Sequence, residues 1–192
     1  MTAIGQPGGW ARSPGRMLLW AVPTALLATP AVMMARAVDG WRWSPFDFVF
    51  AAVLLYGTTA LIDLAIRRGG NTAYRLGAAV AALTALLLVW VNGAVGVIGN
   101  EDNPANLVFL GVIAVALAGS AWARFAARGM AWAMLGACAL TMAVAAAALT
   151  LDLSAGDPPG SAGLALLIGG FALLWGLSAA LFAKAARDAA RL

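Results

Sequence analysis

Residues 76–98 read LGAAVAALTALLLVWVNGAVGVI, a stretch of apolar and small residues without a charged side chain. A helix that crosses a bilayer needs about 20 predominantly apolar residues, because in lipid its backbone must satisfy its own hydrogen bonds. Five further stretches have comparable length and hydrophobicity: residues 17–35, 46–66, 104–123, 130–151 and 162–183. The sequence therefore predicts an all-α, polytopic membrane protein, with residues 1–192 forming a single bundle of six transmembrane helices.

The composition excludes several classes of protein. Of the 192 residues, 63% are hydrophobic and 10% are charged, whereas a soluble domain carries about 25% charged residues. A soluble enzyme, a nucleic-acid-binding domain, a disordered protein and a disulfide scaffold are therefore not expected. The chain has no histidine and a single cysteine, Cys138, so the commonest general base and metal ligand are missing. We expect no cofactor, no metal site and no nucleic-acid partner.

The basic residues predict the orientation. If the N-terminus is cytoplasmic, all of the 12 Lys and Arg except Arg36 and Arg42 fall on the inner side. Cytoplasmic loops carry an excess of Lys and Arg, so we expect both termini in the cytoplasm. The outer loops hold six of the acids, which are Asp39, Asp47, Glu101, Asp102, Asp152 and Asp157.

An alternative exists for the first span. Arg12 and Arg16 precede an apolar run that ends at Ala35-Arg36-Ala37, an arrangement that also resembles a cleavable secretory signal. The apolar core of such a signal is about 7–15 residues long. Because the run here is longer, we favour a first transmembrane helix.

The segment from Trp90 to Asn106 (WVNGAVGVIGNEDNPAN) is the most distinctive part of the chain. Its glycines weaken a helix, so we expect the third helix to end or deform between Asn92 and Gly99. One interpretation is a polar site at the outer side of the bundle, for a small molecule or a hard cation. Its candidate residues are Asn92, Glu101, Asp102, Asn103, Asn106 and Asp47.

The structural interpretation of the same residues is the one we favour. Asn103 precedes Pro104 and is predicted to cap the next helix, with Glu101 and Asp102 near its positive end. Asn92 then bonds a neighbouring helix. Asp47 follows Ser44 by three residues, as in a capping box.

Asp63 is a candidate intramembrane acid, since it lies near the inner end of the second span. Intramembrane acids are often functional. The structural alternative is an ion pair with Arg67, four residues on, or with another arginine at that end.

Three stretches resemble a family of small, uncharacterised bacterial inner-membrane proteins with a W-V-N-x-A-V-G-x-I-G-x-E-D-N-P-A-N segment. They are residues 41–48, 71–75 and 90–106. The resemblance covers roughly residues 41–128. It implies a bacterial inner membrane and implies no activity. Gly93 stands where the family is expected to have a larger apolar residue.

Among functions, we favour a non-catalytic accessory or assembly protein that packs against membrane partners. Small residues that allow close helix packing support it: Gly111, Ala114, Ala118, Gly119, Gly136 and Ala137. One alternative is a homo-oligomeric permease for a small solute or ion, which would use Asn92 and Asp63. A membrane sensor that reads the outer acidic loop is another. An intramembrane enzyme is least favoured, because no nucleophile–base constellation is visible.

Overall fold

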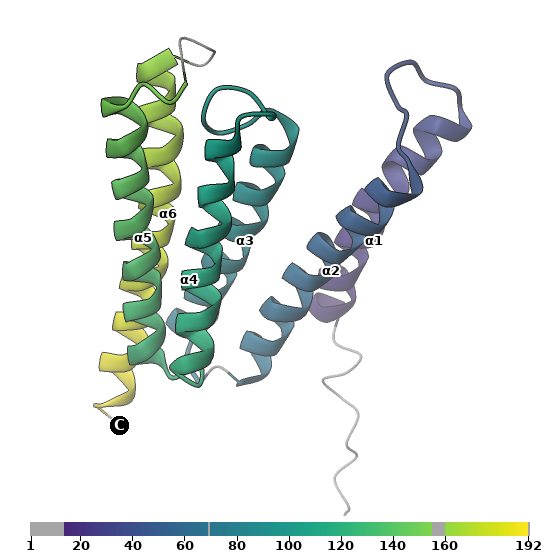
Figure 1. Ribbon diagram of the computed structural model, residues 1–192. Helices are drawn as coiled ribbons and strands as arrows, with labels where there is room; N and C mark the ends of the chain where they lie inside the picture. The colour runs from purple at the N-terminus through teal and green to yellow at the C-terminus, as the bar shows by residue number, and fades with distance from the viewer. Residues whose placement is uncertain (1–13, 69, 155–159, 192) are drawn as a thin grey trace, which may run out of the picture. The chain divides into compact units, whose positions relative to one another are not determined.

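The computed structural model describes residues 14–68, 70–154 and 160–191, and these residues fold into helices joined by short connections (Figure 1). The elements are α1 (Pro14–Ala35), α2 (Pro45–Arg68), α3 (Thr72–Ala94), the 3₁₀ helix η1 (Pro104–Leu107), α4 (Val108–Trp122), α5 (Ala127–Thr150) and α6 (Gly160–Ala189). Within the described ranges, six helical segments are long and apolar enough to cross a membrane, with η1 and α4 forming one of them. The predicted all-α character, with six segments able to span a membrane, is therefore confirmed.

The chain divides into two compact units, residues 1–64 and residues 65–192. We call them the first and the second unit and describe each by itself. The boundary falls near the end of α2. That all six helices form a single bundle stays a prediction.

In the first unit, side chains of the first half of α1 contact side chains between the middle and the end of α2. The hydroxyls of Thr24 and Tyr56 lie 2.8 Å apart, and the ring of Trp20 stacks on that of Tyr56 at 6.3 Å. At the start of α2, the Asp47 carboxylate accepts hydrogen bonds from the backbone N–H and the hydroxyl of Ser44, at 2.7 and 2.8 Å. The predicted capping box is thus confirmed.

In the second unit, α6 packs against both α3 and α5, and α5 also packs against α4. Its core is filled by large side chains from each helix, among them Leu88, Phe109, Met134, Trp175 and Phe182. The Ser178 hydroxyl donates to the carbonyl oxygen of Gly77 at 2.8 Å. A Cβ on Gly77 would lie 3.3 Å from the Phe182 ring, so this glycine lets α3 approach α6 closely.

The small residues of α4 and α5 fall into two groups, one packed between the two helices and one exposed. A Cβ on Gly119 would lie 2.8 Å from the Cβ of Ala133, and Ala137 is fully buried. These residues bring α4 and α5 together. Gly111, Ala114 and Ala118 are instead exposed.

Two helix ends differ from the predicted spans by several residues. The third helix ends at Ala94 rather than residue 98, because Gly96 takes a φ of +74°, outside the helical region. The sixth extends to Ala189 rather than residue 183. Its last residues alternate alanine with charged side chains, which are good helix formers that can reach water from a helix end.

The basic residues of the second unit gather at one of its ends, which we call the basic end. The α2–α3 connection, the α4–α5 turn and the last turns of α6 meet there: Asn71 Nδ2 donates to the Ala185 carbonyl at 3.1 Å, and the Tyr74 hydroxyl to the Phe125 carbonyl at 2.8 Å. All Lys and Arg of residues 65–192 lie on these segments or within a few residues of them: Arg67, Arg68, Arg75, Arg124, Arg128, Lys184, Arg187 and Arg191. Glu101, Asp102 and Asp152 lie on the connections at the opposite end.

Candidate functional site

The connection between α3 and α4, residues 95–103, is a tight loop that depends on two glycines. Gly96 and Gly99 have φ values of +74° and +67°. A Cβ on Gly96 would lie 2.3 Å from the carbonyl carbon of Asn100, so only glycine fits there. The prediction that the third helix ends between Asn92 and Gly99 is confirmed.

The side chain of Asn106 holds this loop together from inside. Its Oδ1 accepts hydrogen bonds from the backbone N–H groups of Val97 and Ile98, at 3.0 and 2.8 Å. Its Nδ2 donates to the carbonyls of Ile98 and Asn100, at 3.3 and 2.7 Å. The residue is 4% exposed. One primary amide thus bonds four backbone groups of the loop, and three of them, on Val97 and Ile98, are buried.

Two other predicted site residues join the same framework. Asn92 Nδ2 donates to the carbonyl of Asn106 at 3.1 Å, which ties the end of α3 to η1. Asn103 Oδ1 accepts from the backbone N–H of Ala105 at 3.0 Å and caps η1. Asn103 Nδ2 donates to the carbonyl of Leu153, beyond α5, at 2.8 Å. The predicted cap at Asn103 and the predicted bond of Asn92 to a neighbouring helix are both present.

One polar atom of the cluster is left over. Asn92 Oδ1 is buried and has no hydrogen-bond partner within the described part of the chain. The same holds for Trp175 Nε1 in the core. Glu101 and Asp102 are exposed on the loop. The structure thus brings Asn92, Asn103 and Asn106 into one hydrogen-bonded framework, with the two acids outside it. Asp47 belongs to the first unit, where it caps α2.

Asp63 is paired with an arginine that sequence spacing did not single out. Arg16 Nε and a terminal guanidinium nitrogen each lie 3.1 Å from a different carboxylate oxygen of Asp63, in a two-pronged ion pair between α1 and α2. Asp63 is 4% exposed. The expected ion pair at this end of α2 is present, and a partner 47 residues away adds a tertiary contact that Arg67 on the same helix could not supply.

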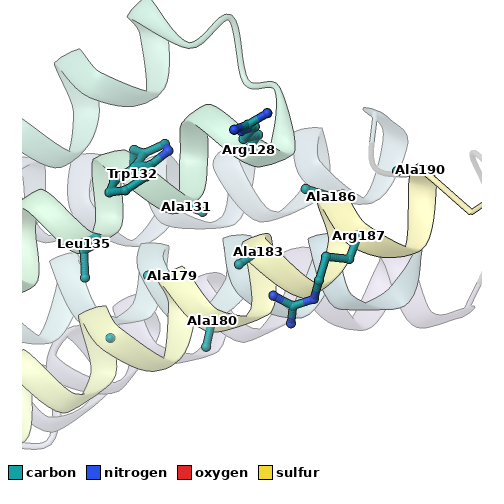
Figure 2. A pocket seen from close by; sticks show the side chains of 11 residues that line it. Arg128, Ala131, Trp132, Leu135, Ala179, Ala180, Ala183, Ala186, Arg187 and Ala190 are labelled. Carbon is teal, nitrogen blue, oxygen red and sulfur yellow. The ribbon is translucent and has the colours of Figure 1, made fainter.

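Sequence reasoning missed a groove on the second unit, between α5 and α6. It has a volume of about 630 Å³ and a floor of alanines, with Arg128, Trp132 and Arg187 at its edges (Figure 2). The signal in the sequence was the spacing: Arg128, Trp132 and Leu135 recur at one helical face, opposite alanines that recur on α6. Alanine is so common in this chain that the pattern does not stand out.

Comparison with known proteins gives no relative: no protein-family model matches the chain, and neither the curated proteins nor the solved structures contain a match. Within the described ranges, no group of three or more His, Cys, Asp or Glu side chains is placed to hold a metal ion. What the geometry defines is a helical protein with six segments long and apolar enough to span a membrane, and with an internally bonded loop at one end of its second unit.

Proposed function

We propose that the protein is a non-catalytic integral protein of a bacterial inner membrane that serves as an accessory or assembly component by packing against membrane partners. Both termini lie in the cytoplasm in this proposal. The gathering of basic residues at one end of the second unit supports that orientation. The bacterial inner membrane is the location that the sequence resemblance of residues 41–128 implies.

The observation that carries the proposal is the exposed face of α4. Gly111, Ala114, Ala118 and Trp122 follow one another at intervals of three and four residues, so they share one side of the helix. None of the three small residues is covered within the second unit, and Trp122 is 93% exposed. A row of small residues lets another helix approach closely, which is how helices associate in lipid.

The polar α3–α4 loop, at the end of the second unit opposite the basic end, fits a structural role better than catalysis. The amides of Asn103 and Asn106 use both their oxygen and their nitrogen on backbone groups of the loop and of the α5 end. The Asn106 amide accepts two and donates two hydrogen bonds, which is its full capacity, so it would have to break one of them to bind a substrate. A protein that acts by packing against membrane partners does not need to break these hydrogen bonds.

A matched pair of variants tests the packing face. Ala118 on α4 and Ala165 on α6 are both exposed alanines, and each is replaced by leucine. The tagged protein is extracted from its native membrane in mild detergent, and the mass and composition of the complex are measured. We expect a stoichiometric partner with the wild type and with Ala165→Leu, and its loss with Ala118→Leu. A protein that purifies alone, or equal behaviour of the two variants, contradicts the proposal.

A homo-oligomeric permease is the second candidate, and the Arg16–Asp63 pair favours it. A buried carboxylate on an apolar helix is costly and often marks an ion pathway. Reconstitution into proteoliposomes tests this function: solute or proton flux that Asp63→Asn abolishes, with the fold intact, would support a permease. Absence of flux from the wild type for protons, alkali cations and small neutral solutes would count against it.

A further inference from the structure

The groove between α5 and α6 has an apolar floor. Ala179, Ala183 and Ala186 of α6 face Ala131 and Leu135 of α5 across it. These side chains offer no hydrogen-bond donor or acceptor (Figure 2). A floor of this kind can bind a methylene chain, because burying the chain's apolar surface is favourable in free energy and needs no hydrogen bond.

The edge of the groove carries positive charge. Arg128 and Arg187 line it and are both exposed. In the part of the chain that the structure describes, neither forms an ion pair, whereas the neighbouring Lys184 is bound to Asp188 at 2.9 Å. A guanidinium offers a planar fork of donors that matches a phosphate. Trp132, 67% exposed, lies beside them, as is common at the level of lipid headgroups.

An anionic amphiphile matches both features at once, and we infer that this groove binds an anionic phospholipid of the surrounding leaflet. Its anionic headgroup lies at the edge that Arg128 of α5 and Arg187 of α6 line, and an acyl chain lies along the alanine floor. Basic pockets between transmembrane helices are a known way to hold anionic headgroups. The inference concerns a lipid and does not depend on the proposed packing function of α4.

Charge complementarity favours a lipid over a second copy of this chain. At the basic end of the second unit, the described acid is Asp188, and Lys184 already neutralises it. A second copy that docked by this end would therefore bring further arginines and no spare carboxylate toward Arg128 and Arg187. Like charges at an interface disfavour that arrangement.

Native mass spectrometry of the full chain in detergent tests the inference. Phosphatidylglycerol and phosphatidylcholine with identical acyl chains are titrated onto delipidated protein. We expect one tightly bound phosphatidylglycerol and weaker binding of phosphatidylcholine. The double variant Arg128→Gln/Arg187→Gln should bind phosphatidylglycerol roughly 30-fold more weakly, which corresponds to about 2 kcal/mol for two arginines. Arg191→Gln, at the same end but outside the groove, is the matched control.

A second variant separates loss of the site from loss of the fold. Ala183→Leu narrows the floor and leaves both arginines in place, so it should weaken phosphatidylglycerol and phosphatidylcholine binding alike. Circular dichroism and size-exclusion chromatography verify folding of every variant. Equal affinity for the two lipids in the wild type, or an equal loss in Arg191→Gln, overturns the inference. So does a dimer that Ala183→Leu dissociates without any effect of lipid, because the groove would then hold a second copy.

Discussion

The guanidinium of Arg16, near the start of α1, donates hydrogen bonds to both carboxylate oxygens of Asp63, near the end of α2. Each bond is 3.1 Å long. The pair closes the α1–α2 hairpin at the end opposite its connection. Asp63 is almost fully buried, while the Arg16 side chain keeps 23% exposure. An ion pair in this setting is more costly to break than one at a protein surface.

We therefore predict that Asp63→Ala lowers the free energy of unfolding by about 3 kcal/mol, because it leaves a partly buried guanidinium without its carboxylate. Arg16→Ala should cost a similar amount. The double variant should be less destabilised than the sum of the two, with a coupling of about 1–3 kcal/mol. Unfolding in detergent micelles, followed by circular dichroism, measures all three. Strict additivity would show that the two side chains do not stabilise each other.

Asn106→Leu should be among the most damaging single changes in the second unit. It removes one amide and leaves the N–H groups of Val97 and Ile98 buried and unpaired. Each such group costs about 1–3 kcal/mol, so we expect a loss of at least 2 kcal/mol. Glu101→Gln, five residues away and exposed, is the control and should change stability by less than about 0.5 kcal/mol. An unchanged free energy of unfolding in Asn106→Leu would mean that the Asn106 side chain does not stabilise the loop.

Asn92→Leu should behave differently from Asn106→Leu. It removes one hydrogen bond to the Asn106 carbonyl, but it also removes a buried oxygen that has no partner in the described structure. The two effects oppose each other, so we expect a change below about 1 kcal/mol. Near-wild-type stability combined with lost partner binding or lost flux would identify Asn92 as part of a site. A large loss of stability would instead assign it a structural role.

Two neighbouring glycines provide a matched pair of substitutions. Gly96→Ala requires a positive φ and places a Cβ against the Asn100 backbone, so it should cost about 3 kcal/mol or more. Gly93 lies in the last turn of α3 with open space around its Cα. Gly93→Ala should be neutral or should stabilise by up to about 1 kcal/mol. Thermal unfolding in detergent compares the two, and equal effects would argue against the loop geometry described above.

Local chemistry explains which parts of this structure could be predicted. Apolar stretches locate the helices, Ser44 and Asp47 mark the start of α2, and Gly96 marks the end of α3, because each signal acts within a few residues. Asn106 was recognised as a polar candidate but not as the support of the loop. Its four partners lie six to nine residues back along the chain, in a loop conformation that no local pattern specifies.

Contacts between distant segments were harder to predict. The spacing on one helix pointed from Asp63 to Arg67, whereas the printed sequence gives no sign that Arg16 lies next to Asp63. The groove of α5 and α6 depends on which faces of two alanine-rich helices meet. Alanine is apolar enough for lipid and small enough for packing, so composition alone does not decide between these two surroundings.

The proposed orientation predicts opposite labelling of the two ends of the second unit. In a Cys138→Ala background, a cysteine at Asp102, exposed on the α3–α4 loop, should react with a membrane-impermeant maleimide in cells whose outer membrane has been permeabilised. A cysteine at Asp188, near the end of α6, should react only after the inner membrane is disrupted, because the basic end faces the cytoplasm. Asp188 takes part in an exposed pair with Lys184, so its loss should leave the fold unchanged. Labelling of the Asp188 position in intact cells, with protection of the Asp102 position, would reverse the topology and would place the arginines of the α5–α6 groove on the periplasmic side.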